Sequence, residues 1–388
     1  MEVHRAPIQT SVIVQGEPDD KRPMTRAGYL VYEAFSCYEA ALGEVGPVAS
    51  GKALHFAADL VCSGGLDIWI RGAYSYAVLH IGLANPRVFV YLRQRIAELD
   101  KRYAELPQET FYNNPEVQSI LGETVLILQL CPKRSRVTWP KVDISTKREG
   151  WLKGVANSPE TKATKQTWSS DSDTVPLYLV SNEICKAVEE GGSERALFWV
   201  RWVLEEDARI RKETKGHGLT TKERGPATHS NKGRTEAGHY VAELLFAIYK
   251  DLSSKNLVRM HEEFTELIRL FRGGEARMPA RLRRDCLGLM TLICCEVPRW
   301  KVPAAQTLVP DPVRLSRAVA QVPSFFKEVL AYPPLRAGKE LKPKMMKATQ
   351  GPRKKKQDGK QVGDMSLDEH LTAYDAAMEA YLTRSGGR

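Results

Sequence analysis

The most constraining feature of the sequence is an apolar run from Ala196 to Leu204. It holds two Trp, one Phe, one Ala and four larger aliphatic residues in nine positions, and Arg201 is its one charged member. A helix that is apolar on almost every side must be buried on almost every side. We therefore expect this run to form a central helix with neighbours on more than one face.

Further segments between residues 177 and 297 show the i, i+3, i+4, i+7 spacing of amphipathic helices. Their apolar positions fall within residues 184–188, 241–252, 260–271 and 282–293. Ser193 precedes the central run, where a side-chain oxygen can accept a hydrogen bond from a free first-turn amide. The sequence predicts a helical array here, and we assign residues 177–335 to this domain.

The N-terminal part of the chain also shows helical patterns. Candidate helices cover residues 25–43, 52–62 and 66–83, and two more follow the pairs Asn85-Pro86 and Asn114-Pro115. Asn is a good N-terminal cap, and Pro fits the first turn because its missing N–H would have no partner there. No sustained period-2 alternation occurs, so we predict an all-α domain over residues 25–131, preceded by a weakly ordered lead-in over residues 1–24.

Two long polar connections interrupt the helical pattern. Residues 132–176 are predicted to be a basic linker containing Trp139, Trp151 and Trp168. These aromatic residues either pin the linker onto the domains or form a basic-aromatic strip that stacks on single-stranded nucleic acid. Residues 211–234 carry seven Lys and Arg against Glu213 and Glu223, which is typical of either a disordered loop or a contact site.

Most of the net charge lies in one segment after a possible helix over residues 313–332. Residues 336–360 hold ten Lys and Arg against two acids, so they carry +8 of the chain's +10. The apolar content of residues 336–363 is too low for folding, which predicts a disordered basic segment. It is either a solvated spacer or a non-specific phosphate-binding tail. The candidate nucleic-acid contacts are Lys342, Lys344, Lys347, Arg353, Lys354, Lys355, Lys356 and Lys360.

The last segment, residues 364–388, is predicted to be an amphipathic helix. Ser366 and Glu369 have the spacing of a capping box, in which each side chain bonds a free amide near the helix start. The helix either packs on its own chain or docks in a groove of a partner protein. Its apolar face, the candidate partner-binding surface, consists of Leu367, Leu371, Tyr374, Met378, Tyr381 and Leu382.

Motifs for nucleotide and metal chemistry are incomplete. Residues 46–53 nearly match a phosphate-binding loop, but Ala53 occupies the position of the Ser or Thr that would hold magnesium. His261-Glu262 begins like a zinc-protease helix, but Thr265 replaces the second His. The sequence contains no Cys-x-x-Cys pair, and the spacings of His217, His229 and His239 match no ligand pattern. We therefore predict no metal and no cofactor.

No catalytic motif is present either, so we do not predict an enzyme. The acidic run Glu205-Glu206-Asp207 is better explained by pairing with Arg209 or Arg211, because adjacent carboxylates on one helix point apart. Four of the seven Cys residues lie in apolar helical contexts, which indicates reduced, buried thiols in an intracellular protein. The sequence shows no signal peptide and no apolar run of about 18 residues. We expect a cytoplasmic or nuclear location and no membrane contact.

The helical array also carries a resemblance. Residues 181–187, the run 196–200, the run 267–271 and the basic residues Arg281 to Arg284 resemble a group of helical proteins encoded by large nucleocytoplasmic DNA viruses. The resemblance covers roughly residues 177–297. It implies a virus-encoded protein that works in an infected cell or is packaged in a virion. The resemblance assigns no catalytic residue to this chain.

Together, these patterns predict an all-α protein with two helical domains, a long linker, a basic tether and a terminal amphipathic helix. The leading functional hypothesis is a non-enzymatic scaffold that binds nucleic acid non-specifically through flexible basic segments. The alternative is a protein-assembly module, such as an accessory subunit of a viral, replication or transcription complex. In that case the terminal helix would dock on the partner protein.

Overall fold

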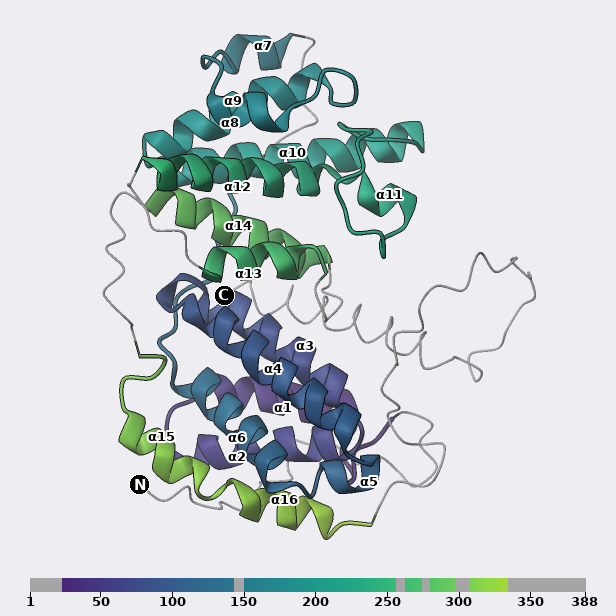
Figure 1. The fold of residues 1–388 in the computed structure, drawn as a ribbon, viewed down its shortest axis with the longest axis vertical. Helices are drawn as coiled ribbons and strands as arrows, with labels where there is room; N and C mark the ends of the chain where they lie inside the picture. Colours follow the sequence, from purple (N-terminus) through teal and green to yellow (C-terminus); the bar gives the residue numbers. More distant parts are fainter. Residues whose placement is uncertain (1–22, 143–149, 256–261, 274–279, 297–306, 334–388) are drawn as a thin grey trace, which may run out of the picture. The chain divides into compact units, whose positions relative to one another are not determined.

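The computed structural model describes residues 23–142, 150–255, 262–273, 280–296 and 307–333. Within these ranges every regular element is a helix, and the strand-like features are two isolated bridges, Met24 with Leu30 and Asp173 with Thr220. The predicted all-α class is therefore confirmed (Figure 1). Contacts between residues divide the chain into two compact units.

The first unit contains residues 23–72, 102–129 and 313–333 of the described chain. Its helices are α1 (Val31–Gly43), α2 (Pro47–Cys62), the first part of α3 (Leu66–Tyr76), α5 (Gln108–Phe111), α6 (Pro115–Leu130), α15 (Pro312–Val319) and α16 (Val322–Leu330). Helix α2 is buried along most of its length and contacts both α1 and α16. It includes residues 47–53, so the segment that resembled a phosphate-binding loop is helical instead.

Helix α16 packs within the first unit, although the predicted boundaries placed residues 177–335 in the second domain. A Cβ added to Gly122 of α6 would lie 2.3 Å from Cγ2 of Val322, so the missing side chain permits this close contact. The predicted helix over residues 313–332 is interrupted between α15 and α16. Pro323 stands in the first turn of α16, where its missing N–H is tolerated.

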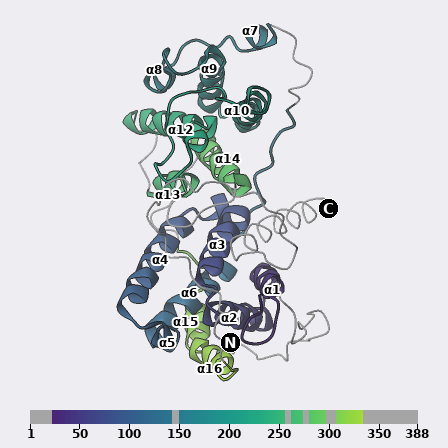
Figure 2. The same ribbon diagram turned by 90° about the vertical axis from the view of Figure 1, so that its right-hand side faces the viewer.

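The second unit contains residues 73–101 and the described part of residues 130–312. Its elements are the end of α3, η2 (Ala77–Ile81), η3 (Gly82–Ala84), most of α4 (Arg87–Glu105), α7 (Trp151–Val155), α8 (Lys162–Thr167), α9 (Val175–Glu189), α10 (Ser193–Thr214), α11 (Asn231–Arg234), α12 (Ala237–Ser254), α13 (Glu262–Phe271) and α14 (Ala280–Glu296). Helix α10 contacts α9, α12 and α14, and these helices lie side by side in both views (Figures 1 and 2). Val200 and Trp202 of α10 are buried, which confirms the predicted central helix.

Helix boundaries differ from the predicted ones at several points. The first helix begins at Val31 and not near Thr25, because Gly28 with a φ of 87° forms a turn before it. The predicted helix over residues 66–83 changes after Tyr76 into the π-helical turn η2 and the 3₁₀ turn η3. The predicted cap at Asn114 is confirmed, since its Oδ1 accepts a hydrogen bond from the Glu116 amide at 2.9 Å.

The start of α10 also corrects the prediction. Ser193 is the first helical residue, and Gly192 precedes it without a side-chain cap. Elsewhere the apolar periodicity located helices well, because the buried face of a helix recurs every three to four residues. No helix in the described ranges is both long enough and apolar enough to cross a membrane.

Candidate functional site

The predicted contact residues at the C-terminal end lie outside the described residues. This holds for the basic segment 336–363 and for the amphipathic helix 364–388. Their proposed roles in binding nucleic acid or a partner protein therefore stay predictions. His261 lies outside the described ranges as well. The described part of the chain offers two candidates, both in the second unit: the basic loop 211–234 and a pocket beside residues 134–140.

The linker between residues 132 and 176 is packed onto the second unit through its aromatic side chains. Trp139 donates from Nε1 to Asp285 Oδ1 at 3.1 Å, the Trp151 ring lies 6.1 Å from that of Trp199, and the Trp168 ring lies 5.0 Å from that of Tyr178. This confirms that the aromatic residues anchor the linker. Stacking of nucleic-acid bases loses support, because each ring already has a partner within the protein.

The segment predicted as the basic loop 211–234 consists of the last turn of α10, a loop and the short helix α11. We keep the name basic loop for this segment, and Arg224 holds it in place. Its side chain is 1% exposed and forms a bidentate ion pair with Asp173, at 2.6 and 2.8 Å between the guanidinium nitrogens and the carboxylate oxygens. Its Nε donates to Glu243 on α12 at 2.8 Å, and its guanidinium carbon lies 4.9 Å from the centre of the Tyr240 ring. The loop is thus fastened to the helical body at a buried point, which excludes the disordered interpretation.

Asp173 is fully enclosed by hydrogen-bond donors. Besides Arg224, its carboxylate accepts from Thr220 Oγ1 at 2.6 Å and from the Ser169 amide at 2.9 Å. Burial alone would raise the pKa of Asp173, but the bonds from Arg224, Thr220 and Ser169 outweigh it and lower that pKa. The carboxylate therefore stays ionised at neutral pH and balances the buried guanidinium.

The acidic run in the second half of α10 provides a second anchor. Asp207 Oδ1 accepts from the Leu219 amide at 2.8 Å, and its Oδ2 accepts from Arg211 Nε at 2.8 Å. Arg209 forms two bonds to Glu206, at 2.7 and 2.9 Å. The prediction that the acidic run pairs with Arg209 and Arg211 is confirmed for Glu206 and Asp207. Glu205 pairs with Arg201 instead, so all three carboxylates already have a partner within the protein.

The exposed surface of the loop is basic. Lys212, Lys215, Lys222 and Lys232 are all exposed, and among the described residues none of their ammonium groups forms an ion pair. The acids Glu213 and Glu223 are paired instead with Arg209 and Arg234, at 2.6 and 2.9 Å. We call these four lysines the loop lysines. Lys232 Nζ lies 3.5 Å from the Lys215 carbonyl oxygen, so at least two of them are neighbours.

Of the three histidines near this loop, two meet inside the protein. The rings of His229 and His239 have centroids 5.5 Å apart, whereas His217 is exposed. His239 is completely buried, and its burial, followed by the nearby Arg283, lowers its pKa to about 3. Within the described chain no group of three or more His, Cys, Asp or Glu side chains is arranged to hold a metal ion.

The second candidate site depends on an extended stretch, residues 134–140, that we call the strap. The Arg134 amide donates to the His80 carbonyl at 2.8 Å, which ties one end of the strap to the π-helical turn η2. The guanidinium of Arg136 binds the buried carboxylate of Asp285 on α14 at 2.6 Å. Arg201 of α10 donates to the Pro140 carbonyl at 2.8 Å, which fixes the other end.

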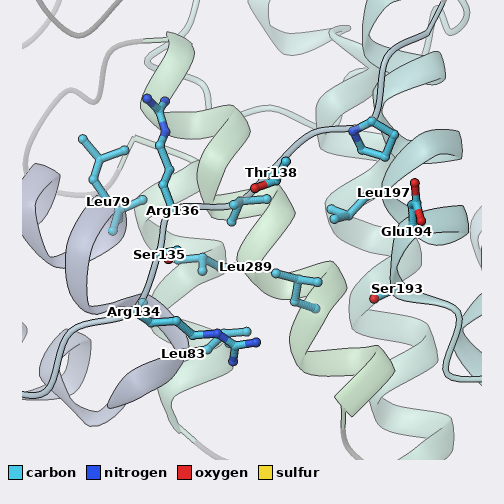
Figure 3. Close-up of a pocket in the computed structure, with 15 residues that line it drawn as sticks. Leu79, Leu83, Arg134, Ser135, Arg136, Thr138, Ser193, Glu194, Leu197 and Leu289 are labelled. Carbon is cyan, nitrogen blue, oxygen red and sulfur yellow. The ribbon is translucent and has the colours of Figure 1, made fainter. Parts of the chain in front are cut away.

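A pocket of about 390 Å³ lies between the strap and the helices beneath it. Side chains from η2, η3, α10 and α14 line it, together with the strap (Figure 3). Its walls include the aliphatic side chains of Leu79, Leu197 and Leu289, and Ser193 and Glu194 border it at the start of α10. A volume in this range is typical of small-molecule sites.

The thiols offer little nucleophilic chemistry. All seven Cys are free, and six of them are buried, which agrees with the predicted reduced thiols. Burial raises the pKa of Cys62 to about 12 and that of Cys185 to about 11. Because the thiolate is the reactive form, such groups are inert near neutral pH.

The sequence did not reveal the buried pair or the pocket. Asp173 and Arg224 are far apart in the chain and sit in polar stretches that look solvated. The one usable signal was the excess of cations in the loop, which marked it as a possible contact site. The basic composition of the linker does not distinguish Arg134 or Arg136 from its other cations.

No protein-family model, curated protein or solved structure matches this chain. The resemblance to helical proteins of large DNA viruses is therefore still a prediction.

Proposed function

We propose that this protein is a non-enzymatic nucleic-acid-associated scaffold that contacts phosphate groups through basic segments. The observation that carries the proposal is the set of loop lysines. They stand exposed and without acidic partners on a loop whose base is buried. An ordered cationic loop loses less conformational entropy on binding than a free chain does, so its charges are more effective.

The charges of this surface favour phosphate neutralisation over base readout. Lysine ammonium groups act as point charges, whereas planar, bidentate arginines read base edges. The arginines of the loop are occupied, since Arg211 pairs with Asp207 and Arg224 pairs with Asp173. The predicted basic segment 336–363 would add further sequence-independent contacts. Binding should therefore be non-specific and strongly dependent on salt.

The test is binding of a fluorescent DNA duplex and a single-stranded RNA to the full chain over a salt series. Binding should depend on salt through the slope of log affinity against log salt concentration. Replacing all four loop lysines by Gln should reduce the magnitude of this slope by about 3 to 4. The control replaces four other lysines of the second unit by Gln. They are Lys162, Lys165, Lys250 and Lys255, three of which are ion-paired and one of which lies over the Phe246 ring.

The control variant loses the same formal charge as the loop variant. If the loop lysines are the contact site, only the loop variant should change the slope. Truncation after Pro334 measures the contribution of the basic segment separately. The proposal is wrong if the full chain binds neither nucleic acid, or if the loop variant and the truncated chain both retain the full slope. In that case the protein-assembly alternative becomes the leading one, tested by capture that depends on Leu371, Tyr374 and Met378.

A further inference from the structure

The pocket beneath the strap has a lining that specifies its ligand. Its apolar walls are aliphatic, and among the described residues no aromatic side chain lines it. Outside the strap they consist of Val78, Leu79, Leu83, Leu197, Leu289 and Leu292. A planar ring would find no aromatic partner to stack on here, whereas a hydrocarbon chain gains from burial against any apolar wall. The walls therefore favour an aliphatic ligand.

The cationic groups at the pocket differ in their availability. Arg136 is committed to Asp285, which is fully buried and would be left without its charge partner if the arginine moved. Arg134 pairs with Glu296 on the surface, where the two side chains are 48% and 35% exposed. In Figure 3 the two guanidinium groups leave the strap in different directions. Arg134 is thus the cation that can exchange its partner for a ligand.

The present partner of Arg134 indicates which anion it accepts. Two guanidinium nitrogens of Arg134 contact the two carboxylate oxygens of Glu296, at 3.0 and 3.4 Å. This fork geometry matches a planar carboxylate. Glu194 also borders the pocket, and its negative charge repels a ligand with two negative charges, such as a phosphate monoester, about twice as strongly as a ligand with one. The charges therefore favour a single carboxylate.

We propose that this pocket binds a free short-chain aliphatic carboxylate. The hydrocarbon tail would lie against Leu79, Leu197 and Leu289, and the carboxylate would replace Glu296 on Arg134. The strap is held at both ends, so the cavity exists before the ligand enters. This inference is independent of the proposed nucleic-acid binding.

The first measurement is a titration of the full chain with butanoate, hexanoate and octanoate. NMR or calorimetry detects binding, and each acid is kept below the concentration at which it aggregates. Each buried methylene group should tighten binding about fourfold until the pocket is full. Octanol and octylamine test the head group and should bind at least tenfold more weakly than octanoate. Vesicles of an anionic phospholipid should not compete, because the pocket is assigned to a free acid.

Two variants locate the site. Thr138 is an exposed strap residue that borders the pocket, and Thr138→Trp should fill the cavity and abolish octanoate binding. Arg134→Gln should weaken octanoate about tenfold and leave octanol unchanged. The control Arg95→Gln removes a partly exposed arginine from α4 and should change neither. Helical circular dichroism spectra establish that each variant is folded.

The inference is overturned if octanoate shows no saturable binding at millimolar concentrations. It is equally overturned if folded Thr138→Trp binds octanoate as well as the original chain, because the ligand then sits elsewhere. Equal affinity for octanoate and octylamine would refute the role assigned to Arg134. Competition by vesicles would reassign the ligand to a lipid and would also contradict the proposal.

Discussion

Replacing Arg224 by Met should destabilise the second unit more than any surface substitution. Met has a similar length and no charge, so the change removes the guanidinium with little loss of packing volume. It leaves Asp173, whose side chain is 0% exposed, with a buried and uncompensated negative charge. The Thr167 carbonyl oxygen and Glu243 also lose hydrogen bonds from Arg224, of 3.1 and 2.8 Å.

The expected loss follows from these contacts. Breaking a buried ion pair by removing one partner costs about 3 to 5 kcal/mol, because the remaining charge stays buried. Asp173 keeps two donors, Thr220 and the Ser169 amide, so the lower part of this range applies. We expect the free energy of unfolding of the second unit to fall by about 3 kcal/mol.

Urea denaturation followed by tryptophan fluorescence measures this loss. Five of the six Trp residues in the described chain belong to the second unit, so the signal reports mainly on that unit. They are Trp139, Trp151, Trp168, Trp199 and Trp202. The control is Arg95→Met, which breaks an exposed pair with Glu98 and should cost no more than about 0.5 kcal/mol.

A loss below about 1 kcal/mol for Arg224→Met would refute the assignment of Arg224 as the loop anchor. A second test uses the double variant Arg224→Met with Asp173→Asn. Asn carries no charge, so it should restore at least half of the lost stability. The lowered pKa of Asp173 contributes to the pH dependence of stability of the original chain at acidic pH. Its contribution is full above the unfolded pKa of about 3.9 and disappears as pH falls through the lower folded value.

Other predictions concern a buried histidine and a close helix contact. Burial, with Arg283 nearby, lowers the pKa of His239 to about 3, so folding requires its neutral form. Stability should fall below pH 6.5, by about 2 kcal/mol at pH 5, and His239→Leu should remove that part of the pH dependence in urea titrations. Gly122→Ala should lower the thermal stability of the first unit by about 1 to 3 kcal/mol, because its Cβ would clash with Val322. Val322→Ala should lower the stability less in the Gly122→Ala variant than in the original chain, because it relieves the clash. A double variant whose loss equals the sum of the two single losses would contradict the clash.

Much of the secondary structure could be predicted from local pattern. The apolar spacing located α10, α12, α13 and α14 within a few residues of their observed bounds. Helix α9 begins at Val175, well before its predicted apolar positions 184–188. Asn114 was a reliable start signal, because its side chain bonds the first-turn amides directly. The predicted helix ends were wrong where two neighbouring residues could both start the helix. Ser193 was the predicted cap, but Gly192 takes that position and Ser193 is the first helical residue.

The sites were less accessible to prediction, because they depend on contacts between distant residues. A cation in a polar loop has the same local pattern whether it faces water or a buried acid. Arg224 therefore could not be distinguished from Lys222. In the structure one is enclosed and the other is exposed. The strap likewise looked like a plain linker until its bonds to η2, α10 and α14 defined a cavity.

The sequence by itself determined that the chain is helical, which of its helices is central, and where most of its positive charge lies. These properties follow from composition and short-range periodicity, which decide how much apolar surface each segment must bury. Tertiary structure alone decided that α16 packs on α2, that Asp173 holds the basic loop, and that the strap covers a pocket. Such pairings are chosen by shape and charge complementarity across the fold, which no single segment encodes.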